Sequence, residues 1–333
     1  MLRYGVVGTS WITESYIAAA RLSGVWELAA VCSRSAEKAA AFAKKHGAAR
    51  WFTDLEEMVN SGTVEAVYIA SPNALHMAHC RVCVEAGVHV LCEKPLTAHP
   101  DELQAVQELA AQKGVVLAEA IMYMHLPARE ALREAVVSIG RIGKAHFDFC
   151  QYSSKYPAYL RGETPNIFNP ALETGALMDL GVYCVYPAVD LFGVPQRVSA
   201  MASFLDTGAD GSGCAVLDYG AHQAVLTYSK IAQGCGVSEV VGDGGSVTVA
   251  SISLLDGVSV RPRNGEERFV GHDDWSREQH MACEAEGFYK YITDPAAAER
   301  YAVAGRTALA VCRVMYEIRR QAGIAFPNDR QEE

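Results

Sequence analysis

The chain has 333 residues, half of them hydrophobic and 20% charged, which is the composition of a globular protein with room for two domains. Lys and Arg total 29 against 39 Asp and Glu, so the net charge is −10, and this argues against nucleic-acid binding, which needs a basic face. No run of 18 apolar residues occurs, so we expect no membrane partner. Ten scattered cysteines predict a cytoplasmic protein with reduced thiols.

The first 120 residues alternate between short apolar segments and helical segments. Five Val-rich segments have the length of buried strands, at residues 2–7, 26–32, 65–70, 88–92 and 115–118. Segments with helical periodicity lie between or after them, at 11–22, 35–46, 54–60, 73–86 and 100–112. This alternation predicts an α/β fold with a doubly wound parallel sheet, and we assign residues 1–122 to a dinucleotide-binding Rossmann domain.

After residue 122 the pattern changes. A helix at 127–138 leads to a strand at 144–152, a Pro-punctuated loop over 153–172 and a helix at 174–191. Consecutive strands with Gly turns then fill 196–270. Two helices, near 276–292 and 299–322, close the chain. Strands grouped in this way predict an α+β domain with a large, mostly antiparallel sheet, and we assign residues 123–333 to substrate binding and dimerisation.

The turn after the first strand has the spacing of a dinucleotide-binding fingerprint. Gly8 provides the tight turn, whereas Ser10 and Thr13 stand where the pattern has its second and third glycines. An imperfect motif of this kind also fits an ordinary strand–helix turn. Its place at the start of the alternation favours cofactor binding, and the residues expected to bind are Gly8, Thr9, Ser10, Trp11 and Ile12.

The end of the second strand indicates which cofactor is bound. An acidic residue there would bind the adenosine ribose of NAD, but this chain has Ser33 and Arg34, with Lys38 one turn later. A hydroxyl and a guanidinium suit a 2′-phosphate, so we expect NADP, with NAD still possible. The alternative is a solvated helix start, with Ser33 or Ser35 as N-cap and Arg34 exposed.

Two further strand ends carry polar residues. Loops at the carboxyl ends of parallel strands form the ligand crevice, and we expect Ser71, Pro72, Asn73, His76, Glu93 and Lys94 to lie there. His76, His79, Cys80 and Cys83 share one helix face, which invites comparison with a zinc site. A single helix lacks the second pair of ligands that closes a structural site, so we expect no metal.

Two sequence blocks resemble one enzyme family. The run from Ala86 to Pro95 (AGVHVLCEKP) resembles a signature of the Gfo/Idh/MocA oxidoreductases. The run from Gly175 to Tyr183 (GALMDLGVY) resembles the family's G-G-G-A-L-x-D-x-G-x-Y/H helix, with Glu173 and Thr174 in place of the first two glycines. Tyr in the last position is the form of the branch that contains dimeric dihydrodiol dehydrogenase, xylose dehydrogenase and glucose–fructose oxidoreductase.

The resemblance implies an NADP(H)-dependent dehydrogenase whose small-molecule substrate is a sugar, a polyol or a trans-dihydrodiol. Lys94, Asp179 and Tyr183 would be catalytic: Tyr183 transfers the proton, Lys94 lowers the pKa of Tyr183, and Asp179 orients the substrate or Lys94. His76 and Lys94 would lie near the nicotinamide, with Asp179 and Tyr183 facing them from the second domain.

The remaining expectations concern the oligomeric state of the protein and two alternative functions. The resemblance implies a homodimer or a dimer of dimers, and the strand positions expected to form the paired sheet face are Val225, Thr227, Val247 and Val249. One rival is an enzyme that uses a bound dinucleotide transiently, without net oxidation or reduction. The other is a catalytically silent regulator that senses NAD(P).

Overall fold

The computed structural model describes residues 1–271 and 274–329, and it divides into two compact units. The first unit contains residues 1–125 and 275–309, and the second contains residues 126–274 and 310–333. Packing defines these units, and each gathers two separate stretches of chain. The functional boundary expected after residue 122 therefore stays a prediction.

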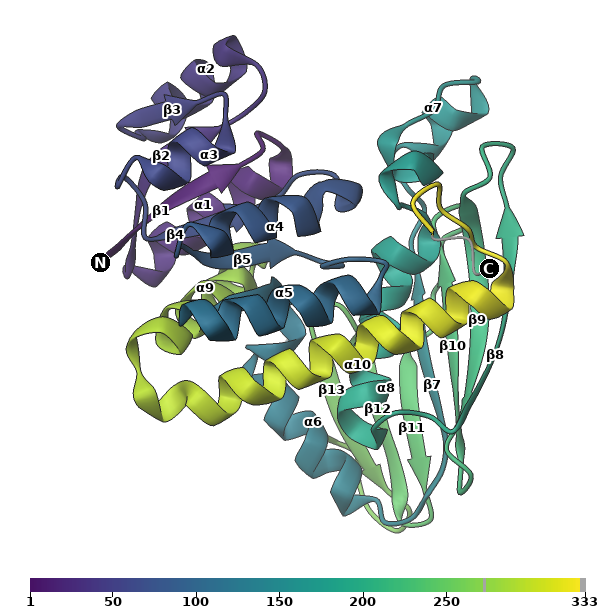
Figure 1. Ribbon diagram of the computed structural model, residues 1–333. Helices are drawn as coiled ribbons and strands as arrows, with labels where there is room; N and C mark the ends of the chain where they lie inside the picture. The colour runs from purple at the N-terminus through teal and green to yellow at the C-terminus, as the bar shows by residue number, and fades with distance from the viewer. Residues whose placement is uncertain (272–273, 330–333) are drawn as a thin grey trace. The chain divides into compact units, whose positions relative to one another are not determined.

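The sheet of the first unit has six strands in the order β3-β2-β1-β4-β5-β6, and every neighbouring pair is parallel. The strands are β1 (Leu2–Val7), β2 (Trp26–Cys32), β3 (Arg50–Phe52), β4 (Ala66–Ile69), β5 (His89–Glu93) and β6 (Leu117–Ala120) (Figure 1). This is the strand order of a dinucleotide-binding Rossmann fold, so the predicted fold is confirmed. Strand β3 was not predicted; it has three residues, of which two are exposed.

Local signals start and stop the helices of this unit, which are α1 (Trp11–Ser23), α2 (Ala36–His46), α3 (Leu55–Asn60), α4 (His76–Glu85), α5 (Pro100–Lys113) and α9 (Arg277–Thr293). Helices α1, α2 and α5 each end at a glycine in the left-handed conformation. Helix α9 comes from late in the sequence but packs on α1. There the indole of Trp26 donates to the carbonyl oxygen of Ala285 at 2.9 Å and stacks on Phe288, so α9 completes the core of this unit.

The sheet of the second unit has eight strands in the order β14-β13-β12-β11-β7-β10-β9-β8. The strands are β7 (Ile142–Cys150), β8 (Arg197–Phe204), β9 (Asp210–Asp218), β10 (Gln223–Ser229), β11 (Ser238–Gly242), β12 (Gly245–Ser251), β13 (Asp256–Pro262) and β14 (Arg268–Phe269). Only the pair β7 and β10 is parallel among these described strands, so the mostly antiparallel sheet is confirmed.

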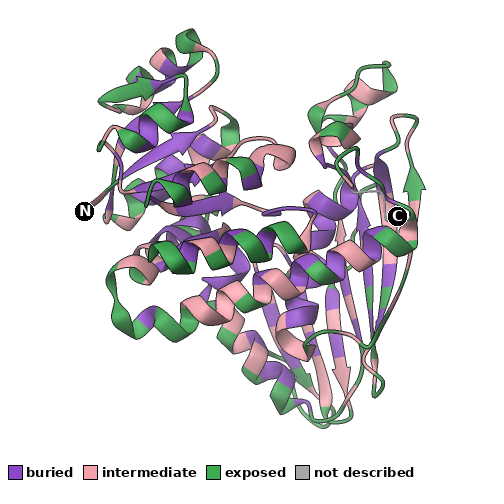
Figure 2. Ribbon diagram, viewed as in Figure 1, coloured by how far each residue is buried: buried purple, intermediate pink, exposed green. Residues whose placement is uncertain are grey.

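The register of this sheet separates a buried face from an open face. Ala224 lies opposite Ala145, which lies opposite Val240, which in turn lies opposite Val247, and all four residues are buried. Helices α6 (Pro127–Ser138) and α8 (Val182–Phe192) contact strands of this sheet. Figure 2 shows the buried residues alternating with more exposed ones along the strands.

The set of residues expected to form the paired face is therefore partly wrong. Val225 is 37% exposed and Thr227 is half-buried, and both belong to the open face. Val247 and Val249 are 0% and 2% exposed, because their register places them on the buried side. Alternation along one strand shows that two faces exist, but only the pairing with neighbouring strands shows which face each residue occupies.

Helical segments also fill the stretch expected as a loop over 153–172, which contains α7 (Tyr156–Leu160) and two short 3₁₀ turns. The helical stretch Pro170–Phe192 is the one among the described residues that is long and apolar enough to cross a membrane, judged by length and composition. However, 72% of its apolar window is buried inside the structure, as in a core helix. The last helix, α10 (Ala298–Ala322), begins in the first unit and ends in the second.

Candidate active site

The turn between β1 and α1 has the geometry of a phosphate cradle. Gly8 has a φ of 106°, and a Cβ atom there would lie 2.6 Å from the carbonyl oxygen of Ala70. Ser10 is the N-cap of α1, but its hydroxyl caps no backbone N–H of the helix and instead forms a 3.4 Å hydrogen bond with the hydroxyl of Thr13. The first N–H groups of α1 are thus left without a side-chain cap, and the cradle fits the pyrophosphate of a dinucleotide.

The next residues of the fingerprint lie at the surface of the first unit. Thr9 and Ile12 are half-buried, whereas Trp11 is 65% exposed. The guanidinium of Arg277, at the start of α9, lies 5.7 Å from the centre of the Trp11 ring. The Trp11 ring therefore provides a flat apolar surface next to the turn at Gly8, and the Arg277 guanidinium lies beside this ring.

The end of β2 presents the residues predicted to select the cofactor. The Ser35 hydroxyl accepts a hydrogen bond from the backbone N–H of Lys38 at 3.3 Å, so Ser35 is the N-cap of α2. Arg34 and Lys38 are exposed, and Ser33 is half-buried. The helix-start interpretation is thus correct for Ser35. Because Ser35 caps the helix, the exposed guanidinium of Arg34 and ammonium of Lys38 are available to a phosphate.

The charge of Arg34 acts on His79, a residue of helix α4. His79 Nδ1 lies 3.0 Å from the Ser71 hydroxyl. Burial lowers the pKa of His79, and the positive charge of Arg34 lowers it further. The loops after β2 and β4 and the first turn of α4 thus carry Arg34, Ser71 and His79 at the carboxyl edge of the sheet.

His76 links the two loops that were expected to form the crevice. It is 1% exposed, with Nδ1 2.9 Å from the carbonyl oxygen of Pro95 and Nε2 2.9 Å from that of Ser71. Both ring nitrogens thus face backbone oxygens. This arrangement suits a residue that positions the loops better than one that exchanges a proton with a substrate. Pro72 and Asn73, in the loop before it, are half-buried.

The Lys94 turn, defined here as Lys94–Leu96, is held by carboxyl groups. Glu93 Oε2 accepts a hydrogen bond from the backbone N–H of Lys94 at 3.3 Å, and Glu119 Oε1 accepts one from that of Leu96 at 2.9 Å. The Tyr68 hydroxyl donates to Glu93 Oε1. Lys94 is half-buried and follows β5 directly, so its backbone is fixed at the carboxyl edge of the sheet.

In the second unit, Asp179 and Tyr183 lie on one helical stretch. Asp179 belongs to a π-helical turn, Leu177–Gly181, and Tyr183 lies in the first turn of α8. The Tyr183 ring packs edge-on against Phe149 of β7, with 5.5 Å between ring centres. π-helical turns inside α-helices are frequent at functional sites, because they redirect side chains without ending the helix.

Asp179 has a partner that sequence reasoning missed. The ammonium of Lys230, just after β10, forms an ion pair with Asp179 Oδ2. The Lys230 side chain is 8% exposed and that of Asp179 is 30% exposed. A lysine after a strand is typical of a solvated turn, and no sequence signal distinguishes this one. Only the packing of β10 against the π-helical turn brings the two together.

A buried aspartate caps the start of the same helix. Asp210 Oδ2 accepts a hydrogen bond from the backbone N–H of Leu177 at 2.7 Å. Its other oxygen occupies the space that a Cβ atom on residue 175 would need, which explains the glycine at that position. Asp210 is 0% exposed, and burial raises its pKa to about 7, although the hydrogen bond from Leu177 opposes the rise.

The two residues that replace family glycines are well accommodated. Glu173 has a left-handed backbone, with a φ of 55° that glycine adopts more easily, and its Oε1 accepts a hydrogen bond from the Asn328 side chain at 3.1 Å. The Thr174 hydroxyl lies 2.7 Å from the carbonyl oxygen of Asn166 and 3.0 Å from that of Asn169. The loop therefore keeps a glycine-like turn at Glu173 and gains side-chain contacts.

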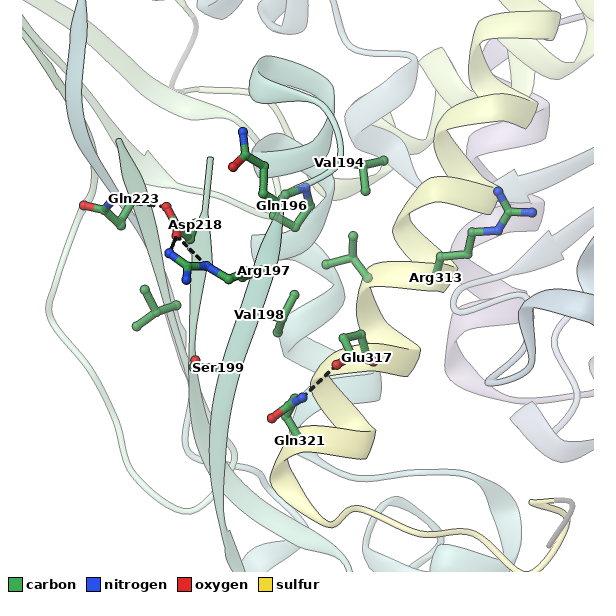
Figure 3. Close-up of a pocket in the computed structure, with 13 residues that line it drawn as sticks. Val194, Gln196, Arg197, Val198, Ser199, Asp218, Gln223, Arg313, Glu317 and Gln321 are labelled. Carbon is green, nitrogen blue, oxygen red and sulfur yellow. Dashed lines mark hydrogen bonds and ion pairs between the residues drawn. The ribbon is translucent and has the colours of Figure 1, made fainter. Parts of the chain in front are cut away.

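A hollow of about 710 Å³ in the second unit lies elsewhere on the sheet (Figure 3). It lies between the β8 and β9 strands and the C-terminal half of α10, and the lining includes Arg197, Asp218 and Glu317. Arg197 and Asp218 form an ion pair across the two strands at 2.6 Å. None of the residues predicted for the site line this hollow, so we do not assign it to catalysis.

Comparison with known proteins identifies the family. The family described as "Oxidoreductase family, NAD-binding Rossmann fold" matches residues 2–121, and the Gfo/Idh/MocA C-terminal domain matches residues 129–248. The chain therefore belongs to the Gfo/Idh/MocA family of oxidoreductases, and it is an NAD(P)-binding enzyme. The resemblance found in the two sequence blocks is confirmed.

Individual relatives place the chain within this family. It is 39% identical over 329 residues to the scyllo-inositol 2-dehydrogenase (NADP(+)) IolU of Bacillus subtilis (strain 168), covering 99% of both chains. It is 30% identical over 249 residues to the trans-1,2-dihydrobenzene-1,2-diol dehydrogenase of Macaca fuscata fuscata, covering 73% of both. A solved 3-ketoreductase from Actinomadura kijaniata has the same fold, with a TM-score of 0.81 at 21% identity over 96% of this chain and 98% of that one.

Proposed function

We propose that the protein is an NADP(H)-preferring dehydrogenase that transfers hydride between nicotinamide and a secondary alcohol or carbonyl group of a sugar, a polyol or a trans-dihydrodiol. The observation that carries the proposal is the strand order of the first unit. It sets Gly8, Arg34 and Lys94 just after β1, β2 and β5, at the carboxyl edge where this fold binds its ligands.

The residues present fit a dinucleotide with a 2′-phosphate. The cradle at Gly8 and the uncapped start of α1 would hold the pyrophosphate, with Thr9, Ser10, Trp11 and Ile12 around it. Ser33, Arg34 and Lys38 would hold the 2′-phosphate, and the loops with Ser71, Pro72, Asn73, His76 and Glu93 would shape the crevice towards Lys94. When bound, the nicotinamide ring supplies the hydride acceptor.

The chain's own residues would manage the proton. Tyr183 would accept the proton of the substrate hydroxyl, and a free tyrosine, with a pKa of about 10, needs help to do so near neutral pH. Lys94 would provide that help, since a neighbouring cation favours the phenolate. Asp179, held by Lys230, would orient the substrate or Lys94 from the π-helical turn.

Among substrates we place cyclic polyols first. The scyllo-inositol dehydrogenase of Bacillus subtilis matches this chain over almost its whole length, whereas the dihydrodiol dehydrogenase matches over 73%. We also propose that the protein forms a homodimer, or a dimer of dimers, through the open face of the second sheet, where Val225 is exposed. The cytoplasmic location stays a prediction.

The experiment that tests the proposal is an assay of NADPH formation with NADP⁺ and a panel of cyclic polyols, aldoses, anhydrosugars and trans-dihydrodiols. We expect sustained turnover with at least one member. Reduction that stops at one equivalent per enzyme favours transient use of the cofactor instead. Binding of NADP(H) with no reduction on any member favours a silent sensor.

A further inference from the structure

Three carboxyl groups from different elements of the first unit interact electrostatically. Glu284 of α9 interacts electrostatically with Glu93, at the end of β5, and with Glu119 of β6. Glu284 is 1% exposed, whereas Glu93 and Glu119 are half-buried. We call these three residues the carboxyl cluster.

Glu284 lacks the compensation that a buried negative charge requires. The charged groups that act most on it are Glu93 and Glu119, which have the same sign, and its Oε2 is buried without a hydrogen-bond partner. Burial first, and then these two carboxylates, raise the pKa of Glu284 well above its ordinary value. An ionised carboxylate in such surroundings is much less stable than the neutral acid.

Among the described residues, no positively charged group forms an ion pair or a hydrogen bond with Glu284. Tyr16 of α1 and Tyr68 of β4 interact with Glu284, and burial raises the pKa of both hydroxyls. On α9 itself, His280 Nδ1 lies 2.8 Å from the carbonyl oxygen of Ser276. His125 packs against Gly287, one turn further along α9.

The carboxyl cluster is joined to the Lys94 turn by hydrogen bonds. Glu93 accepts from the backbone N–H of Lys94 and Glu119 from that of Leu96. Both acceptors work best as carboxylates. A third negative charge, on Glu284, would repel the carboxylates of Glu93 and Glu119. A neutral Glu284 would not disturb their hydrogen bonds to the turn.

We propose that Glu284 is a neutral carboxylic acid in the folded protein, and that it is a positioning residue for the Lys94 turn. This inference rests on the proposed function only for the role of Lys94. The protonation of Glu284 itself is a property of the fold and is testable without a substrate.

The first experiment measures the proton directly by infrared spectroscopy of the full-length protein. A protonated buried carboxyl group has a C=O stretching band separate from that of carboxylates. Burial also raises the pKa of the Asp210 carboxyl group, so all spectra use the Asp210→Asn background. We expect a carboxylic-acid band at neutral pH that Glu284→Gln removes. The matched control, Glu286→Gln, changes a half-buried glutamate on the same helix, with a side chain that is 47% exposed, and should leave the band intact.

A second measurement covers the case in which the band is hard to assign. The melting temperature of Glu284→Gln minus that of its parent should increase from about pH 5 to about pH 8, because only the parent must keep a proton as the pH rises. A Glu284 that is ionised at neutral pH would give no removable band and a difference that does not change with pH over this range. That pair of results would overturn the proposal, whether or not the protein oxidises any polyol.

The positioning role has its own readout. Glu284→Gln keeps the shape and neutrality of the acid, so turnover at neutral pH should stay within about threefold of the wild type. At high pH the wild type should lose turnover as Glu284 ionises, and Glu284→Gln should not. Identical pH profiles for the two enzymes would contradict the positioning role.

Discussion

Asp179 on the π-helical turn is ion-paired with Lys230, a lysine whose side chain is 8% exposed. The Lys230 ammonium holds this carboxylate one turn before Tyr183 on a mostly buried helix. Removal of Asp179 would therefore leave the Lys230 ammonium without its ion-pair partner in a poorly solvated place.

A double-mutant cycle tests this coupling. Lys230→Met should lower the free energy of unfolding by about 1–3 kcal/mol, less than for a fully buried pair because Asp179 is partly exposed. Asp179→Asn should cost a similar amount, and the double mutant much less than the sum. Urea denaturation of the four proteins measures the cycle. Strict additivity would show that the pair contributes no coupling energy.

Coenzyme preference is expected to depend on Arg34. Its guanidinium is exposed at the end of β2, and the loss of a charged hydrogen bond to phosphate costs about 1.5–3 kcal/mol. Arg34→Asp should therefore weaken NADPH binding by roughly 10–100-fold and affect NADH little. Titration calorimetry with both cofactors measures this. The control Lys44→Asp makes the same change of charge at the other end of α2 and should leave both affinities unchanged. Equal affinities of the wild type for NADPH and NADH would contradict the assignment.

The capping residue Asp210 should make stability depend on pH. Its pKa is about 7 in the folded protein against 3.8 when unfolded, so the folded state holds a proton that the unfolded state has already lost. Wild-type stability should therefore fall as the pH rises from about 4 to about 7, by on the order of 4 kcal/mol if no other group compensates. The melting temperature of Asp210→Asn relative to the wild type should rise over the same range. A constant difference would mean that Asp210 is ionised throughout.

If the protein dimerises through the open sheet face, a charge introduced on that face should weaken the dimer. Val225→Glu should shift the mass from that of an assembly towards the 36.0 kDa monomer, because it places a charge on an exposed apolar position of that face. Val137→Glu is the control, since Val137 is 80% exposed on α6, away from the sheet. Light scattering of the three proteins measures the masses. A monomeric wild type at micromolar concentration would refute the proposal.

The fold was largely predictable because its patterns are local. The Val-rich strands and the glycines that end α1, α2 and α5 follow from periodicity and backbone conformation. Strand β3 was missed, because Arg50 and Trp51 are exposed and three residues show no period. The face occupied by Val247 could not be predicted, since it depends on a register shared with Val240 and Ala145.

The candidate site was predictable only where a motif carried it. Gly8, Lys94 and Tyr183 stand in recognisable blocks of sequence. Lys230, Asp210 and Glu284 do not, because each acquires its partners by tertiary packing of residues far apart in the chain. Burial raises the pKa values of Asp210 and Glu284, and no local sequence pattern encodes burial of this kind.

The proposed proton transfer predicts how two variants behave. Tyr183→Phe should lower turnover by roughly 10²–10⁴ and leave NADPH affinity unchanged, and Lys94→Met should cause a loss of similar size. The double mutant should fall little further, because the two residues act as a unit. Tyr219 is the control: its hydroxyl donates to the carbonyl oxygen of Ala188, so Tyr219→Phe should lower stability but not turnover. Undiminished turnover of Tyr183→Phe would remove Tyr183 from the mechanism.

Isotope transfer tests the central claim, hydride transfer to a nicotinamide, most directly. The substrate that the panel identifies is deuterated at its carbinol carbon and incubated with NADP⁺, and the reduced cofactor is analysed by mass spectrometry and NMR. We expect deuterium at C4 of NADPH, in an amount many times that of the enzyme. NADPH without deuterium, or a deuterated cofactor limited to one equivalent per enzyme, would contradict the claim.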